Sequence, residues 1–214
     1  ATKRGQRFVT RDARPSLDPP PTVMSCCCCR WLRGRGSSKE KSFELGVLDQ
    51  PLVRLDRSGA DVTVTSRATG DSVKGKGVAF ASTAIEQDAA YWEVHVLTGK
   101  GRFRVGVCRN LDEEAMRGDV GDENASWGLR SEDASAVEGD VIGVAFGQAE
   151  LPNLSFFLNG ELLEQGQVNR IRGEVFPAVS VSDSAELRCV FDEAQFEHAP
   201  PRTHSALRVT QSLI

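Results

Sequence analysis

Four consecutive cysteines, Cys26, Cys27, Cys28 and Cys29, form the densest group of reactive side chains in the sequence. Neighbouring side chains point to opposite sides of an extended chain and lie about 100° apart on a helix, so four adjacent thiols cannot surround one metal ion. Zinc sites built on paired cysteines need a second pair, and the sequence has none. We therefore expect no metal site here.

The same tract suits reversible S-acylation, which makes all four cysteines candidate lipidation sites. Arg30, Arg33 and Arg35 follow closely, and each adds about 1 kcal/mol of attraction to an anionic lipid surface. Two or more acyl chains give stable anchoring where one gives only weak binding. The alternative is a reduced thiol tract without any modification, and the sequence leaves both open.

The inventory for catalysis is thin. The only histidines are His95, His198 and His204, and no serine, cysteine or aspartate beside them forms a recognisable nucleophile arrangement. The G-x-S-x-G, Walker and H-E-x-x-H patterns are absent from the sequence. We expect a protein that is not an enzyme and has no catalytic residue and no cofactor.

Charge is distributed unevenly along the chain. Residues 1–41 contain ten Lys and Arg against three Asp and Glu, while the remaining residues contain sixteen against twenty-seven. A nucleic-acid-binding face needs clustered positive charge, so we expect no nucleic-acid binding by the acidic body. The basic arm alone suits lipid, RNA or an acidic protein surface.

The first 23 residues are rich in Arg and Pro and permit two interpretations. A mitochondrial transit peptide is disfavoured by Asp12, Asp18 and the prolines at 19–21. We prefer the second interpretation, in which Met24 is the natural start and the cysteine tract lies at the terminus. Neither a membrane-spanning apolar stretch nor a secretory signal is present in the sequence. We expect a cytoplasmic protein, attached to a membrane or part of a cytoskeletal assembly.

From residue 43 onward the pattern is that of an all-β domain. Short apolar runs alternate with Gly, Asp, Asn and Ser clusters, and no stretch has a convincing helical period. Asn159-Gly160 predicts a two-residue hairpin turn, because a type I′ turn needs positive φ at both positions. The expected strands, which form two antiparallel sheets packed face to face, are 52–56, 61–66, 78–82, 91–98, 102–109, 141–147, 154–159, 175–181 and 186–192.

Six ordered blocks in this region resemble the SPRY domain family. They are Tyr-Trp-Glu-Val at 91–94, Phe-Arg-Val-Gly-Val at 103–107, Trp-Gly-Leu-Arg at 127–130, Glu-Gly-Asp-Val-Ile-Gly-Val at 138–144, Leu-Ser-Phe-Phe-Leu-Asn-Gly at 154–160 and Phe-Pro-Ala-Val at 176–179. The resemblance covers roughly residues 45–195, and the cysteine-rich start and short length are similar to a small stand-alone subgroup.

This resemblance implies a bent, concanavalin-like antiparallel β-sandwich that acts as a protein-interaction module or adaptor without catalytic activity. The expected organisation is a non-globular arm at 1–42, a SPRY domain at 43–197 and a C-terminal extension at 198–214. We expect the bulky aromatics of the blocks to fill the core between the sheets. An alternative role is a structural subunit of a large cytoskeletal or organellar assembly, with the arm contacting neighbouring chains.

Loops on a rigid sandwich are the expected binding elements. The longest polar stretch, 110–126, is strongly acidic, which favours a basic segment of a protein partner. Arg102, Arg104 and Arg130 form a contrasting basic set, and the sequence does not settle whether they share a face. The candidate partner-binding residues are Asp112, Glu113, Asp119, Asp122, Glu123, Arg102 and Arg130.

Overall fold

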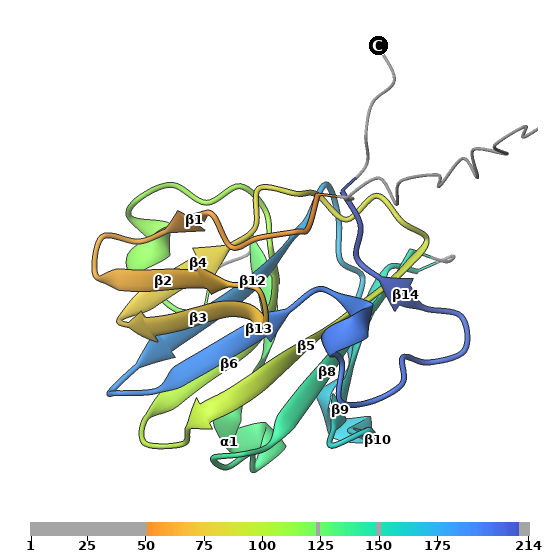
Figure 1. Cartoon of the computed structure of the whole chain (residues 1–214). Helices are drawn as coiled ribbons and strands as arrows, with labels where there is room; N and C mark the ends of the chain where they lie inside the picture. Colours follow the sequence, from red (N-terminus) through yellow and green to blue (C-terminus); the bar gives the residue numbers. More distant parts are fainter. Residues whose placement is uncertain (1–50, 123–124, 149–150, 210–214) are drawn as a thin grey trace, which may run out of the picture. The chain divides into compact units, whose positions relative to one another are not determined.

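Figure 1 shows a computed structural model of the chain, in which two β-sheets pack against each other. The structure describes residues 51–122, 125–148 and 151–209, all of which belong to one compact unit, 47–214. The basic arm at 1–42, its four cysteines and Glu123 lie outside the described residues. The domain boundaries expected from the sequence therefore stay predictions.

The two sheets differ in size, and both are mainly antiparallel. In spatial order, sheet A contains β1 (Arg57–Ser58), β4 (Gly77–Phe80), β12 (Phe176–Ser182), β6 (Arg102–Cys108) and β7 (Ser126–Arg130). Sheet B runs through β10 (Glu161–Leu162), β9 (Asn153–Leu158), β8 (Val141–Gly147), β5 (Ala89–Thr98), β13 (Glu186–Val190), β3 (Gly70–Gly75) and β2 (Val62–Arg67). In addition, β11 (Val168–Asn169) pairs with β9, and β14 (Ser205–Ala206) pairs with β5 in parallel.

In residues 51–122, 125–148 and 151–209, helical structure is confined to single turns between strands. These are η1 (Ala115–Arg117), α1 (Ser131–Ala134), η2 (Glu164–Gly166) and η3 (Glu193–Gln195). The η1 turn lies in the long connection from β6 to β7, and η3 begins the segment that leads from β13 to β14. Because the helical elements are so short, the two sheets are the main scaffold of the domain.

The main core lies between the two sheets and follows from period-2 alternation along the strands. Sheet A supplies Phe103, Val105 and Val107 from β6, and sheet B supplies Trp92 and Val94 from β5, all almost fully buried. Each buried aliphatic or aromatic side chain contributes about 1.5–3 kcal/mol relative to exposure. The predicted all-β sandwich is confirmed.

The predicted hairpin at Asn159-Gly160 is also confirmed. Asn159 has φ 50° and Gly160 has φ 83°, as a type I′ turn requires. Leu158 pairs with Glu161 directly across the turn, so β9 and β10 are joined by the two residues between them.

One strand prediction is wrong, two strands of five or more residues were not predicted, and the aromatic prediction needs correction. Residues 52–56 form no strand, β7 is not among the predicted strands, and β3 was missed because it presents only Val73 as an apolar side chain. Its buried Asp71 accepts the backbone N–H of Leu55 at 2.8 Å, so a polar residue occupies an inward position. Of the bulky aromatics, Phe157 and Phe176 lie on the outer faces of the sheets, because alternation directs their neighbours inward.

Candidate interaction surface

The outer face of sheet A carries three arginines from two neighbouring strands. Side chains alternate along β6, so Arg102 and Arg104 point outward while Phe103 between them is buried in the core. Arg130, the last residue of β7, lies directly opposite Arg104 in the strand register. The basic residues that the sequence could not place relative to one another therefore share one face.

Arg104 is the most firmly held of the three. Its side chain is 17% exposed, and Nη1 donates to Asp122 Oδ1 at 2.6 Å and to the Val120 carbonyl at 3.2 Å. Its Nη2 lies 3.5 Å from Asp119 Oδ2. Charge-assisted bonds of this kind are the stronger class of protein hydrogen bonds. They fasten the acidic stretch of the β6–β7 connection to the sheet.

Arg102 and Arg130 are held much less. Arg102 Nε donates to Asp183 Oδ2 at 3.2 Å, but both side chains are more than half exposed, and such pairs contribute about 0–1 kcal/mol. Arg130 is exposed and forms no ion pair with any residue in the part of the chain that the structure describes. Its charge is therefore free to meet a ligand.

A cavity of about 230 Å³ lies among these side chains. The polar residues that line it are Arg102, Arg104, Arg130, Asp119, Glu132 and Asp133. Three predicted partner-binding residues, Arg102, Asp119 and Arg130, thus come together at one site although they are distant in sequence. The charges at this site balance, with three cations and three carboxylates.

The other predicted residues lie elsewhere. Asp122 joins the group only through Arg104. Asp112 Oδ1 accepts the backbone N–H of Ala115 at 2.9 Å and so begins the η1 turn, which is a structural contact. Glu113 is exposed and does not line the cavity.

An apolar cluster holds the 110–122 loop on the outer face of sheet A. Phe80 and Phe176 stack at a tilt with ring centroids 6.2 Å apart, and Leu111 and Met116 of the loop pack against this cluster. Val120 is fully buried there and donates its backbone N–H to Ser180 Oγ at 3.2 Å. The loop is therefore an ordered support for the charged residues that it presents.

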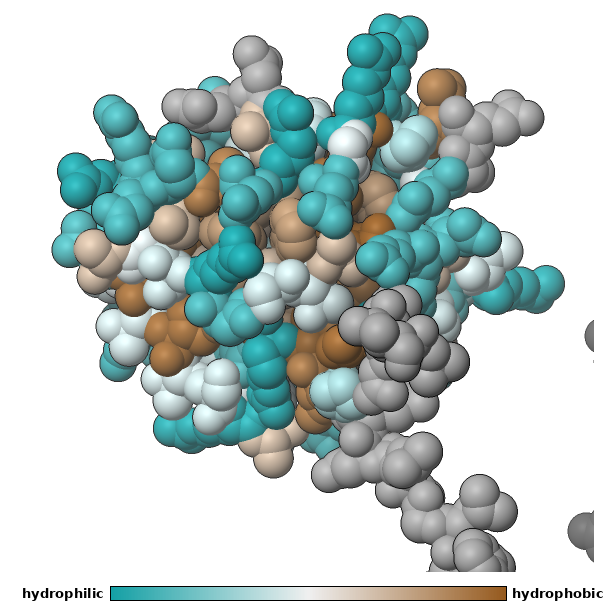
Figure 2. Space-filling view, turned by 90° about the horizontal axis from the view of Figure 1, so that it is seen from above, coloured by the Kyte–Doolittle hydropathy of each residue, from teal (hydrophilic) through white to brown (hydrophobic). Residues whose placement is uncertain are grey.

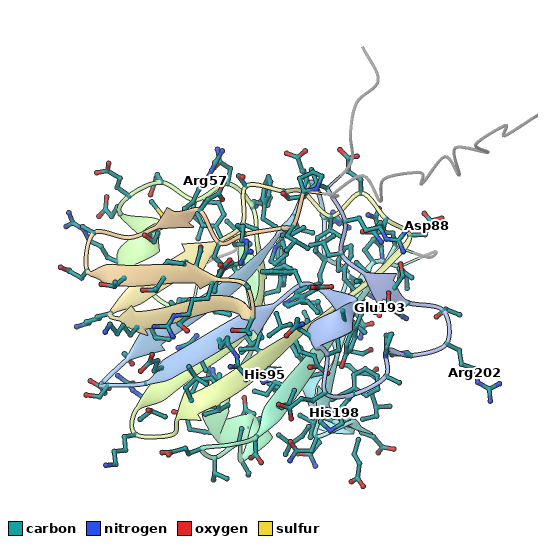
Figure 3. All side chains as sticks on the ribbon, viewed as in Figure 1. Arg57, Asp88, His95, Glu193, His198 and Arg202 are labelled. Atoms are coloured by element: carbon teal, nitrogen blue, oxygen red, sulfur yellow. The ribbon has the colours of Figure 1, made fainter. Side chains whose placement is uncertain are left out.

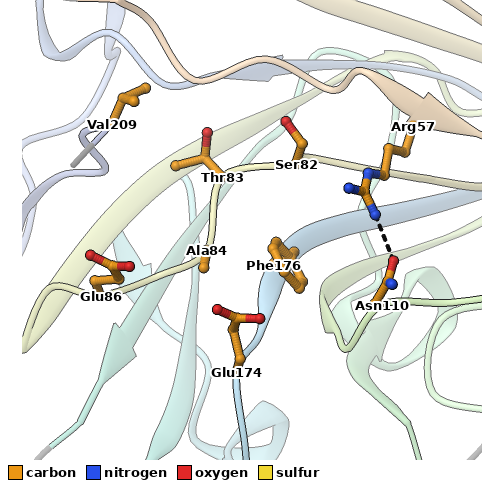
Figure 4. Close-up of a pocket in the computed structure, with 9 residues that line it drawn as sticks. All are labelled: Arg57, Ser82, Thr83, Ala84, Glu86, Asn110, Glu174, Phe176 and Val209. Carbon is orange, nitrogen blue, oxygen red and sulfur yellow. Dashed lines mark hydrogen bonds between the residues drawn. The ribbon is translucent and has the colours of Figure 1, made fainter. Parts of the chain in front are cut away.

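A larger cavity, of about 460 Å³, lies at the other end of the same loop (Figure 4). Arg57 Nη1 donates to Asn110 Oδ1 at 2.6 Å, and the Arg57 guanidinium lies over the Phe80 ring at 5.6 Å. Figure 4 shows the Glu86 and Glu174 carboxylates away from this arginine. Sequence reasoning missed this site because its residues come from several segments with no common motif.

Exposed hydrophobic residues do not mark a single docking patch. In the described part of the chain, the large ones are Leu52, Val137, Leu151 and Leu162, which belong to separate segments. Figure 2 shows hydrophobic residues in small groups between hydrophilic side chains on the face it presents. Scattered surface hydrophobics are normal and do not by themselves mark a binding site.

The outer face of sheet B contains a buried carboxylate that sequence reasoning did not single out. Glu93 is fully buried, and its two oxygens accept the backbone N–H groups of Glu197 and His198, each at 2.8 Å. His95 Nε2 lies 3.1 Å from Glu93 Oε2, and the Tyr91 hydroxyl donates to Oε1 at 3.3 Å. This network ties the segment after β13 to β5, and Figure 3 places His95 and His198 on the same side of the sheet.

The environment sets the charge state of Glu93. Burial alone would raise its pKa, but the hydrogen bonds from His95 and from the two backbone N–H groups lower the pKa below its usual value. Arg188 Nη2, which can only donate, lies 3.0 Å from His95 Nδ1, and Glu197 Oε1 lies 3.3 Å from the same nitrogen. His95 donates from Nε2 to an ionised Glu93.

The described residues offer little for nucleophilic or metal chemistry. Burial raises the pKa of the Cys108 thiol to about 12, and burial also raises the pKa of Cys189. Within the described ranges no group of three or more His, Cys, Asp and Glu is placed to hold a metal ion. Within the same ranges no helix is long and apolar enough to cross a membrane.

A family model and curated relatives both match this chain to the SPRY domain. A family model of the SPRY domain matches residues 89–194. SPRY domain-containing protein 7 of Gallus gallus is 30% identical over 187 residues, which cover 80% of this chain and 89% of that protein. The protein of the same name from Homo sapiens is 30% identical over 169 residues, covering 72% of this chain and 82% of its own length.

Two solved structures also match. One is described as the crystal structure of a human SPRY domain, with 19% identity and a TM-score of 0.47, covering 59% of this chain and 94% of that one. The TRIM65 PSpry domain has 11% identity and a TM-score of 0.47, covering 67% and 90%. The match to the relatives, over most of both chains, shows that this chain belongs to the SPRY domain family.

Proposed function

We propose that this protein is a non-catalytic adaptor whose protein partner docks on the outer face of sheet A, over the cavity beside Arg130. SPRY domains are protein-interaction modules, which gives the class of function. The observation that supports the site is the exposed, unpaired Arg130 at a cavity formed by residues distant in sequence. Strand β7 fixes the backbone of Arg130, so binding has to order only its side chain.

The charges around the cavity indicate what the partner must carry. Arg104 already neutralises much of Asp119 and Asp122, so the acidic loop has less free charge than its composition suggests. Arg130 has no such partner among the described residues. We therefore expect a partner segment with an acidic side chain for Arg130, while a basic side chain opposite the exposed Glu113 stays a prediction.

Charge reversal tests this site. Affinity purification with quantitative mass spectrometry should compare the unmodified protein with Arg130→Glu and with Arg172→Glu, a matched reversal at an exposed position outside the cavity. The proposal predicts at least one partner that Arg130→Glu loses and Arg172→Glu keeps. Identical partner sets for the two variants would contradict it.

We further propose that the cysteine tract attaches this adaptor to a cytoplasmic membrane face through S-acylation. The support is the sequence alone, four adjacent thiols followed by three arginines. Hydroxylamine-sensitive acyl groups on Cys26, Cys27, Cys28 and Cys29 are expected, and their replacement by serine should release the protein into the soluble fraction. Unchanged fractionation would remove the membrane attachment from the proposal.

An assembly role is the alternative, with the basic residues at 1–41 contacting neighbouring chains in a cytoskeletal or organellar complex. Deletion of these residues would then abolish incorporation into the complex, while serine replacement of the cysteines would leave it intact. The two experiments therefore separate the membrane role from the assembly role.

A further inference from the structure

The outer face of sheet B near strand β2 gathers positive charge on an otherwise acidic body. Arg67 of β2, Lys74 of β3 and Arg188 of β13 line one cavity of about 210 Å³, in which Glu186 is the only acidic lining residue. From residue 42 onward the chain has sixteen basic residues against twenty-seven acidic ones. The net charge of the side chains that line this cavity is therefore positive, whereas the net charge of the surrounding domain is negative.

The strand register brings the polar side chains of this site together. Thr65 of β2 lies opposite Ser72 of β3, and Ser72 lies opposite Arg188 of β13, so one row crosses three adjacent strands. Arg67 is two residues beyond Thr65 and therefore points to the same face. It lies opposite Gly70, which has no side chain to cover it. This arrangement leaves the row open to a ligand.

The cations at this site have donors to spare. In the described part of the chain, no acceptor or ion-pair partner is found for the charged groups of Arg67 and Lys74. Arg188 uses Nη2 on His95, but its Nε is buried and has no hydrogen-bond partner. Buried donors are almost always satisfied, so an orphaned one needs an explanation. Glu186 lies opposite Lys74 in the register and forms no ion pair with Arg67 or Arg188.

We propose that this cavity binds a phosphoryl group, carried by a phosphorylated serine or threonine of an extended protein segment. An arginine fork and an ammonium group are the preferred partners of phosphate oxygens. The hydroxyls of Thr65, Thr69 and Ser72, which also line the cavity, add neutral donors. The cavity volume of about 210 Å³ corresponds to about seven water molecules, which is enough space for the phosphoryl group and part of the side chain that carries it.

The neighbouring strand indicates why the group comes on a polypeptide. Strand β2 ends the order of sheet B, so its outer edge pairs with no other strand of the described residues. An extended segment can add to such an edge through main-chain hydrogen bonds. Three cations on an acidic body are too few for nucleic acid or an anionic bilayer, which need a broad basic surface.

A titration of the isotopically labelled full chain tests the proposal. Amide shifts are followed by NMR with inorganic phosphate, with a blocked phosphoserine peptide and its unphosphorylated form, and with phosphatidylserine–phosphatidylcholine vesicles. We expect saturable shifts around Arg67, Ser72 and Arg188, with tighter binding of the phosphopeptide than of phosphate. The unphosphorylated peptide should cause none of these shifts.

Matched variants locate the site. Lys74→Gln should weaken phosphopeptide binding about tenfold, because one charge-assisted bond is lost. Lys76→Gln, a similar change just beyond β3 and outside the cavity, should leave binding unchanged. The proposal is overturned if the two variants bind alike, if phosphate and phosphopeptide give no saturable shifts at these strands, or if vesicles alone bind.

Discussion

The outer faces of the two sheets use their charges differently. On sheet A, Arg104 forms ion pairs with two aspartates. Arg130 has no ion-pair partner among the described residues and lines the cavity of about 230 Å³. On sheet B, the segment after β13 covers Glu93 on strand β5. Strands β2 and β3 present Arg67 and Lys74, which have no partners among the described residues. On both sheets, the paired charges hold the fold together, and the unpaired charges are available to a ligand.

The largest effect is expected where a charge is wholly internal. Glu93→Gln should lower the free energy of unfolding by about 3 kcal/mol, because an amide nitrogen would face a backbone N–H donor that the carboxylate now satisfies. Urea denaturation measures the change. Glu186→Gln, which removes a charge without a partner in the described ranges, is the control and should change stability by less than about 0.5 kcal/mol. Equal losses of unfolding free energy in the two variants would contradict the distinction between a charge that holds the fold together and an unpaired one.

The ring that covers Glu93 gives a second test. Gly143 lies opposite Glu93, and a Cβ there would overlap the Tyr91 phenol group. Gly143→Ala should therefore destabilise the domain by about 2 kcal/mol through overpacking. At Gly147 on the same strand the nearest atom to an added Cβ is 3.7 Å away, so Gly147→Ala should be nearly neutral in thermal unfolding. The reverse order of effects would refute this packing.

On sheet A, the ion pairs of Arg104 and Arg102 should differ in how much they stabilise the fold. Arg104→Ala should cost about 1–2 kcal/mol and speed amide hydrogen exchange across 119–122, because this arginine holds the loop. Arg102→Ala removes an exposed pair and should cost no more than about 0.5 kcal/mol, with exchange in the loop unchanged. Similar exchange in both variants would show that the loop is held by its apolar contacts alone.

The smallest effect is expected from pH, because burial and hydrogen bonding act on the Glu93 pKa in opposite directions. A carboxyl whose pKa is lowered in the folded state stabilises the fold fully above its ordinary pKa of 4.5 and progressively less as the pH falls toward the folded value. The stability difference between the unmodified protein and Glu93→Gln should stay constant above pH 4.5 and shrink below it. A constant difference in acid would contradict an ionised Glu93.

The sequence predicted the parts of this molecule that local chemistry determines. The alternation in β6 and the turn at Asn159-Gly160 depend only on neighbouring residues, and both were identified correctly. Strand β3 was missed because its buried Asp71 makes an inward position look exposed. Its partner, the backbone N–H of Leu55, lies sixteen residues away, which no local pattern reveals.

The candidate sites depend on strand register, which a single sequence does not provide. Arg102 and Arg130 are far apart in the chain and meet only because β6 pairs with β7. The same applies to Arg67 and Arg188, which are joined through β3. The sequence places Glu93 in a family block and on the same side of its strand as His95, and its buried role becomes visible only once the backbone at 197–198 is placed over it.

One parallel measurement tests the central distinction most directly. Proteins captured by the Arg130→Glu and Arg67→Glu variants are compared with those captured by the unmodified chain, before and after phosphatase treatment of the lysate. We expect Arg130→Glu to lose partners that resist phosphatase, and Arg67→Glu to lose only partners that phosphatase also removes. Loss of the same partners in both variants, or of none in either, would contradict two separate binding faces.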